Sequence, residues 1–199
     1  MNPIAQADAW LFQLLNLRLV HPAADDLMVF LTSFRLSVHI FLLAVFFIVL
    51  RKGKEGLVIL FLAVLAVGIS DQLASGIMKP LFQRVRPCYA LAEFRLLVSQ
   101  PGTWSFASSH AANAAAVASM IWIFFWRGAL VDKAFSVLMI VHGSLVAYSR
   151  IYVGVHYPGD VLGGIVTGLV ASGSVYTLAA WLVKNGMLNS IIRGNSRLP

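Results

Sequence analysis

Residues 149–160, with the sequence SRIYVGVHYPGD, guide the interpretation of the whole chain. They place an arginine, a histidine and a carboxylate between two apolar runs that are long enough to cross a bilayer. Charged groups are costly at a membrane boundary, so their presence there indicates a functional site. A carboxylate can fix one ring nitrogen of a histidine and leave the other free to attack, and an arginine can grip a phosphate through two parallel hydrogen bonds.

The composition predicts an integral membrane protein with a single domain over residues 1–199. The chain is 59% hydrophobic and only 12% charged, whereas a soluble domain usually carries about twice that charged fraction. The net charge of +7 fits anchoring charges and an anionic substrate better than nucleic acid, because the basic residues are dispersed. The single cysteine, Cys88, excludes an internal disulfide and a cysteine-rich metal site.

The apolar runs predict an all-α membrane bundle of about five transmembrane helices, with six spans possible. Residues 3–20 alternate apolar and polar side chains at helical spacing, which predicts an amphipathic helix lying in the interface. The spans are expected at residues 27–50, 57–78, 108–126, 134–149 and 158–183. The polar segment 79–107, which contains Pro87, Pro101 and Gly102, is expected to form an outer loop.

The distribution of Lys and Arg predicts the orientation. Just over half of them fall in segments 51–56 and 127–133 and in the C-terminal tail, which the positive-inside rule places in the cytoplasm. The N-terminus and segments 79–110 and 149–160 then lie together on the extracytoplasmic face.

This orientation brings three polar clusters to one surface: Lys79 and Arg86 in KPLFQRVRP, Ser108, Ser109 and His110 in SFASSHAANAAA, and Ser149, Arg150, His156 and Asp160. The three cations complement a phosphate and can stabilise its equatorial oxygens in place of a metal ion. Backbone N–H groups at a helix start suit an anion. Two histidines allow one to attack while the other protonates the leaving group.

Small residues predict how two spans pack. Alanines open the 108–126 span, and Gly163, Gly164 and Gly168 lie early in the 158–183 span, so the two helices can approach closely. Such packing would bring His110 and His156 together at the outer end of the bundle.

The combination Lys-x6-Arg-Pro, Ser-x-His and Ser-Arg-x5-His-x3-Asp resembles the type 2 phosphatidic acid phosphatase superfamily, over about residues 70–165. The resemblance implies that His156 is the nucleophile that forms a phosphohistidine, that Asp160 orients it and that His110 protonates the leaving oxygen. It implies that the phosphate is held by Lys79, Arg86, Ser108, the Ser109 backbone and Arg150. It implies no cofactor and no metal.

The second motif departs from the usual Pro-Ser-Gly-His of that family, because Ala107 replaces the proline and Ser109 replaces the glycine. Glycine is usual where the backbone takes a positive φ or approaches a ligand closely. If a positive φ is required, Ser109 costs roughly 1 kcal/mol or more. The amide of Ser109 is retained in either case.

The resemblance implies a metal-independent lipid phosphatase of the plasma (inner) membrane, acting on a phosphorylated lipid at the extracytoplasmic surface. Undecaprenyl diphosphate is the first expected substrate, and phosphatidylglycerophosphate and lipid A 1-phosphate are alternatives. A non-enzymatic lipid transporter or scaffold is the alternative of another class, and the retention of both histidines favours the enzyme. No nucleic acid and no obligate protein partner are expected.

Other polar residues receive simpler interpretations. Arg84 and Arg95 are interpreted as surface charges or weak contacts to an anionic headgroup. Arg35 and Asp71 should lie inside the bilayer, where an ion pair between them is one hypothesis and a proton or substrate role for Asp71 is the other. Three further histidines are interpreted as structural: His21, His39 and His142.

Overall fold

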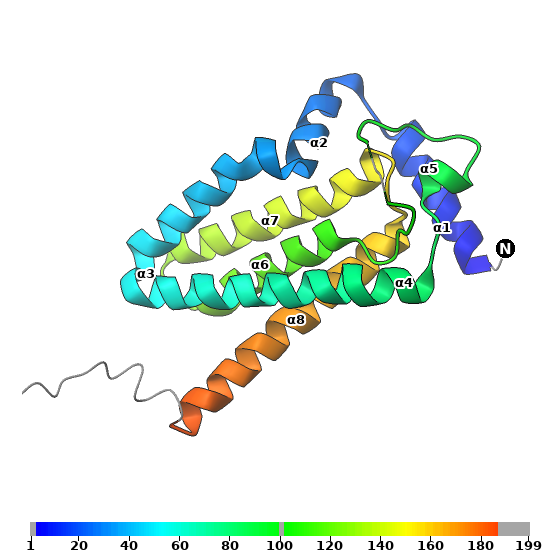
Figure 1. Ribbon diagram of the computed structural model, residues 1–199. Coiled ribbons are helices and arrows are strands. Elements are labelled where there is room, and N and C mark those ends of the chain that lie inside the picture. The colour runs from blue at the N-terminus through cyan, green and yellow to red at the C-terminus, as the bar shows by residue number, and fades with distance from the viewer. Residues whose placement is uncertain (1–2, 100–101, 187–199) are drawn as a thin grey trace, which may run out of the picture.

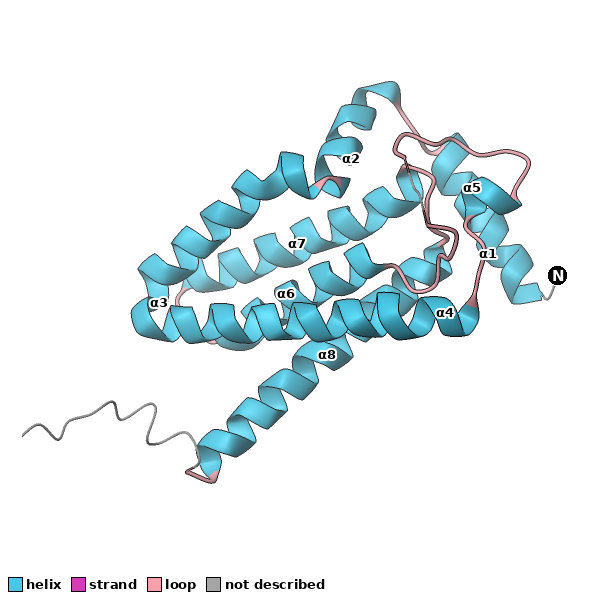
Figure 2. Cartoon of the chain, in the orientation of Figure 1, coloured by secondary structure: helices cyan, strands magenta, loops and turns pink. Residues whose placement is uncertain are grey.

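A computed structural model describes residues 3–99 and 102–186 (Figure 1). Every regular element in those ranges is a helix (Figure 2). The α-helices are α1 (Pro3–Gln13), α2 (Asp25–Thr32), α3 (Phe34–Asp71), α4 (Lys79–Phe82), α5 (Pro87–Ala90), α6 (Ser109–Phe125), α7 (Leu130–Tyr152) and α8 (Pro158–Lys184). The all-α membrane bundle is confirmed. Pro101 and the tail beyond residue 186 lie outside the described residues.

Helix α3 reverses direction at Gly53, within the segment 51–56 that the sequence predicts between two spans. At Gly53 the backbone takes φ 53° and ψ −125°, which favours glycine, and α3 folds back on itself at this point (Figure 1). The expected loop at 51–56 is therefore a tight turn. Before the first residue of α3, the backbone of Ser33 is extended and separates α2 from α3, so a break interrupts the expected span 27–50.

The expected outer loop 79–107 begins with helix. A π-helical stretch, Gln72–Met78, continues α3 directly into α4. Pro80 does not end the helix here because it occupies the first turn of α4, where a missing N–H is tolerated. Lys79 is thereby fixed at the end of a rigid limb.

Several of the helices are long and apolar enough to cross a membrane. By length and composition, three stretches of the described residues qualify, Arg35–Phe82, Leu130–Tyr152 and Pro158–Lys184, and α6 is a shorter apolar helix. Because the first stretch folds back at Gly53, it supplies two limbs of the bundle. Large apolar side chains on the outer surface, such as Leu43 at 67% exposed, suit contact with lipid.

Helix α6 lies at the centre of the bundle and packs against α3, α7 and α8. Its backbone crosses α8 where that helix has glycines. A Cβ added at Gly168 would lie 2.1 Å from the carbonyl oxygen of Ala112, and one added at Gly164 would lie 2.4 Å from that of Ser108. The close packing expected from the small residues is confirmed.

The bundle has two different ends. Helices α1, α4 and α5, the start of α6 and the connection from α7 to α8 gather at one end (Figure 1). The Gly53 turn lies at the other end, where Arg51 and Asp132 form an ion pair of 3.0 Å.

Helix α1 packs across the first of these ends, with Phe12 fully buried. Beyond α1, the side-chain amide of the buried Asn16 donates to the carbonyl oxygen of Tyr152 at 2.8 Å. The apolar Ile4 and Trp10 are 82% and 62% exposed. The N-terminal segment is therefore tied to the site end of the bundle by an apolar and a polar side chain, Phe12 and Asn16.

Candidate active site

His156 lies in the short connection from α7 to α8 and is 2% exposed. Its Nε2 is 2.9 Å from Nη1 of Arg86, and its Nδ1 is 3.5 Å from Oδ2 of Asp160. A guanidinium can only donate, so Nε2 accepts and the ring proton is assigned to Nδ1, facing the carboxylate. At 3.5 Å the Nδ1 contact is too long for a hydrogen bond, and such contacts commonly tighten when substrate binds.

The surroundings of His156 favour a neutral imidazole. Burial lowers the pKa of His156 to about 4, although the carboxylate of Asp160 acts in the opposite direction. The ring therefore keeps a lone pair on Nε2 at neutral pH. Burial also lowers the pKa of Arg86, whose guanidinium donates to the carbonyl oxygens of Gly102 at 2.6 Å and Val155 at 2.9 Å.

Asp160 connects the parts of the site. It lies in the first turn of α8, where Oδ2 accepts from the backbone N–H of Tyr157 at 2.9 Å and Oδ1 accepts from Arg84 at 2.8 Å. Its backbone carbonyl accepts from the N–H of Ser108 at 3.0 Å. Asp160 therefore fixes the start of α6 relative to His156.

An extended segment carries Arg84 and Arg86. An isolated antiparallel bridge between Val85 and Trp104 holds it, together with a hydrogen bond from the N–H of Ser105 to the carbonyl of Arg84 at 2.7 Å. Residues two apart in an extended chain point to the same side. One arginine thus reaches the carboxylate and the other, Arg86, reaches the imidazole.

Lys79 and Ser109 are in direct contact. Nζ of Lys79 donates to Oγ of Ser109 at 2.7 Å and to Oγ of Ser75 at 3.1 Å. Ser109 lies in the first turn of α6, and the positive-φ residues of the described ranges do not include it. The strain considered at this position is therefore absent. The hydroxyl makes a contact that glycine could not make, and Ala107 is fully buried next to it.

Ser108 caps α6 with an extended backbone, at φ −72° and ψ 111°. Its Oγ is buried and has no hydrogen-bond partner within the described ranges. An unsatisfied hydroxyl beside the unpaired N–H groups of a helix start is suited to an anion. Arg150 is 4% exposed, and its Nη1 donates to the hydroxyl of Thr32 in α2.

His110 lines a cavity of about 420 Å³ between α3, α6 and α7. Asp71, Asn113 and His142 also line it, among mostly apolar walls. His110 lies close enough to His156, Arg150 and Lys79 to interact with them electrostatically. All eight residues singled out from the sequence are thus at one end of the bundle.

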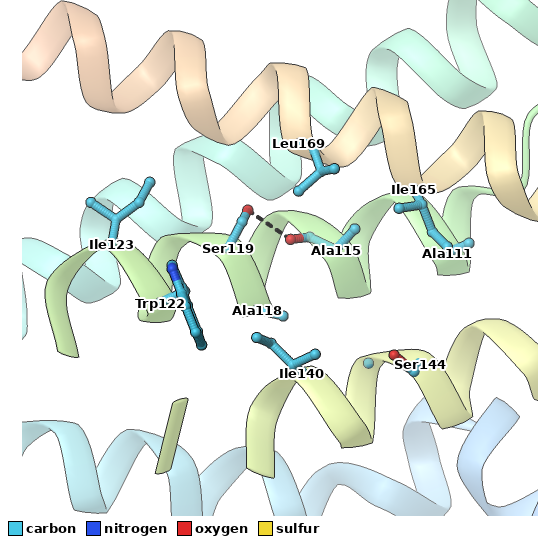
Figure 3. A pocket seen from close by; sticks show the side chains of 11 residues that line it. Ala111, Ala115, Ala118, Ser119, Trp122, Ile123, Ile140, Ser144, Ile165 and Leu169 are labelled. Atoms are coloured by element: carbon cyan, nitrogen blue, oxygen red, sulfur yellow. Dashed lines mark hydrogen bonds between the residues drawn. The ribbon is translucent and has the colours of Figure 1, made fainter. Parts of the chain in front are cut away.

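A second cavity, of about 350 Å³, lies between α6, α7 and α8 (Figure 3). Its walls are apolar, with Ile140, Ile165 and Leu169 pointing into it. The hydroxyl of Ser119 donates to the carbonyl of Ala115 at 2.7 Å, so it is already satisfied. None of the eight site residues lines this cavity.

One interpretation of the sequence is wrong. Arg84 is not a surface charge, because it pairs with Asp160 and also with Asp8 at 2.6 Å. Arg95 is a partly exposed charge that pairs with Asp25. The two-residue spacing of Arg84 and Arg86 before a proline was a signal that could have identified Arg84.

The ion pair considered between Arg35 and Asp71 is not formed within the part of the chain that the structure describes. Arg35 is exposed on the outer surface of α3. Asp71 instead accepts a hydrogen bond from the side-chain amide of Asn113 at 3.2 Å.

The chain is similar to known proteins. The model of the PAP2 superfamily matches residues 56–184. The chain is 32% identical to the lipid A 4'-phosphatase of Porphyromonas gingivalis, over 88% of this chain and 74% of that protein. It is 33% identical to the undecaprenyl-diphosphatase of Sulfolobus acidocaldarius, over 79% and 71% of the two chains.

A solved structure agrees. The crystal structure of a transmembrane PAP2-type phosphatidylglycerolphosphate phosphatase from Bacillus subtilis superposes with a TM-score of 0.68 at 25% identity, covering 92% of this chain and 89% of that one. The resemblance seen in the motifs is confirmed, and this chain belongs to the PAP2 superfamily.

Proposed function

We propose that this protein is a metal-independent phosphatase of membrane lipids that works through a phosphohistidine on His156. The observation that carries the proposal is the buried imidazole whose Nε2 faces the cation of Arg86 while its Nδ1 faces Asp160. The relatives named above are phosphatases of lipid phosphates or diphosphates.

The phosphate would bind between the fixed donors at this end of the bundle. These are the side chains of Lys79, Arg86, Arg150 and Ser108 and the backbone N–H of Ser109. The N–H of Arg86 that faces Nε2 of His156 would donate to a phosphate oxygen instead. This change frees the lone pair of Nε2 for attack. Cations placed at the equatorial oxygens stabilise the charge of an in-line displacement.

The reaction would then proceed in two balanced steps. Nε2 of His156 forms a bond to phosphorus as the bond to the leaving oxygen breaks, and His110 gives that oxygen a proton. Water next attacks phosphorus, His110 takes a proton from it, and the P–N bond breaks to release inorganic phosphate. Asp160 stabilises the positive charge on the imidazole in both steps.

The lipid part of the substrate would lie in the cavity beside His110, whose walls on α3, α6 and α7 are mostly apolar. Undecaprenyl diphosphate is our first candidate substrate, and phosphatidylglycerophosphate and phosphorylated lipid A are alternatives, in line with the spread of the relatives' names. The site would face the extracytoplasmic side of the plasma membrane, as the Lys and Arg distribution predicts.

The test is phosphate release from a panel of purified lipid phosphates in detergent containing EDTA. We expect metal-independent activity that vanadate inhibits, because vanadate mimics the trigonal-bipyramidal phosphoryl group. His156→Ala should abolish activity. Activity that strictly requires an added metal, or full activity in His156→Ala, would contradict the mechanism. The ratio of kcat/KM values across the panel identifies the substrate.

A further inference from the structure

We propose that the N-terminal helix α1 is part of the catalytic apparatus, with Asp8 and Arg84 acting as positioning residues for Asp160 and, through it, for His156. This inference depends on the proposed role of His156 as nucleophile. Neither positioning residue needs to contact the substrate.

Arg84 lies between two carboxylates from opposite ends of the sequence. Its Nη1 donates to Oδ1 of Asp160 at 2.8 Å, and its Nη2 donates to Oδ2 of Asp8 at 2.6 Å. Its guanidinium carbon lies 4.0 Å from the centre of the Tyr157 ring. These contacts hold the guanidinium on three sides, so it can fix the carboxylate that faces the nucleophile.

Asp8 also holds the same turn of α8 directly. Its second oxygen, Oδ1, accepts from the backbone N–H of Gly159 at 2.8 Å. Asp8 therefore contacts the residue before Asp160 as well as the arginine that binds Asp160. One side chain of α1 thus holds the start of α8 by two routes.

Anchoring of the N-terminal segment does not require Asp8. Phe12 is fully buried and packs edge-on against Tyr157, with ring centres 5.6 Å apart. Asn16 is fully buried and bonds to the backbone of Arg95 in both directions, at 2.9 Å and 2.7 Å. Phe12 and Asn16 already anchor the segment, so the contacts of Asp8 with Arg84 and the N–H of Gly159 are available for a positioning role.

The charges of Arg84 and Asp160 give Asp8 an electrostatic role. The side chains of Arg84, Asp8 and Asp160 are 28%, 13% and 0% exposed, so water screens them only partly. Burial acts to lower the pKa of Arg84, but Asp160 and Asp8 outweigh it and raise that pKa, so the guanidinium stays charged. Because Asp8 shares the positive charge of Arg84, that charge neutralises the carboxylate of Asp160 less. Asp160 therefore interacts more strongly with the imidazole of His156.

The two positions therefore have opposite electrostatic effects on His156. Asp8→Asn removes a negative charge and leaves Arg84 to neutralise Asp160, so the acid limb of the pH profile should move to lower pH. Arg84→Gln removes the cation, so the limb should move to higher pH. The other charged or titratable groups facing the imidazole, Arg86, Arg150 and His110, are unchanged in both variants.

The experiment measures kcat, KM and the pH profile of kcat/KM for the full chain in detergent, using a short-chain lipid phosphate. Dividing each profile by that of the wild type cancels the titration of the substrate. We expect kcat to fall about tenfold in both variants, a loss on the scale seen for residues that orient a functional side chain through a hydrogen bond, with KM within about twofold. Asp26→Asn, an exposed carboxylate at the start of α2, is the matched control and should behave as wild type.

The outcomes separate this inference from the proposed function. If His156→Ala is inactive while Asp8→Asn matches wild type in kcat and pH profile, the positioning role is wrong and the nucleophile stands. If both variants move the acid limb in the same direction and lose thermal stability in parallel, their role is structural and the inference is overturned. If His156→Ala remains active, the proposed function itself fails.

Discussion

At the scale of single residues, some of the contacts that hold His156 could be predicted from the sequence and others could not. Asp160 follows it by four positions, so their proximity could be predicted from spacing alone. The contact between Arg84 and Asp8 could not, because the two lie 76 positions apart in the sequence and meet only through the placement of α1. Local spacing predicts neighbours within a turn, whereas long-range pairs depend on the packing of whole elements.

Ser109 offers a test of the departure from the usual glycine. Because the phosphate contact proposed there comes from the backbone N–H, Ser109→Gly should keep kcat within about threefold of wild type, less than about 1 kcal/mol. Loss of the hydroxyl removes a partner of Lys79, so KM should not rise. Ser109→Ala is the control for the hydroxyl alone. A tenfold or greater loss of kcat in both variants would show that the hydroxyl takes part in the reaction.

The buried imidazole also predicts how stability depends on pH. The pKa of His156 is lowered to about 4 in the folded protein, against about 6.5 in an unfolded chain. Between these values the unfolded chain binds more protons, so the free energy of unfolding falls as the pH drops through this window, by at most about 1.4 kcal/mol per pH unit.

His156→Gln lacks this titration. The melting temperature of the wild type should therefore fall more steeply than that of His156→Gln between about pH 6.5 and pH 4, the window set by the two pKa values. The measurement is a thermal unfolding series in detergent. Parallel curves for the two proteins would show that His156 does not titrate as its burial implies.

At the scale of elements, the crossing of α6 and α8 sets the distance between the two histidines. It could be predicted, because alanines in one helix and glycines in the other leave a distinct pattern. The reversal near Gly53 could be predicted as well, because the basic segment 51–56 separates two apolar runs, although its tight turn inside one continuous helix could not. The break at Ser33 could not be predicted, because it lies within an apolar run.

A matched pair of glycine substitutions tests this crossing. Gly168→Ala would place a Cβ 2.1 Å from the Ala112 carbonyl, so it should destabilise the protein by about 1–3 kcal/mol. It should also lower activity, because α6 carries His110. Gly173→Ala, later in the same helix, meets nothing within 4 Å and should be neutral or stabilising by up to about 1 kcal/mol. Equal melting temperatures for both variants would contradict the crossing.

At the scale of the whole molecule, every proposed catalytic group lies at one end of the bundle and the Arg51–Asp132 ion pair at the other. The sequence predicted this separation from charge, since segments that share a side of the membrane must share an end of the bundle. It did not predict that the N-terminal segment would turn its polar residues toward the site, because amphipathic periodicity does not say which face meets protein.

The orientation can be checked by labelling single cysteines in a Cys88→Ser background with an impermeant maleimide. Glu93→Cys lies in the segment between α5 and α6 and should react in intact spheroplasts, because this end is proposed to be extracytoplasmic. Arg127→Cys lies at the opposite end and should react only after permeabilisation. Both positions are exposed. The reverse pattern would place the site in the cytoplasm.

The most direct test of the central claim is to trap the phosphorylated enzyme. A phosphorus-labelled lipid phosphate is mixed with the protein and quenched in alkali, where a phosphohistidine survives, and then exposed to acid, where it hydrolyses. The account predicts an acid-labile label on the peptide containing His156, and none in His156→Ala. Label on another residue, or undiminished phosphate release by His156→Ala, would contradict it.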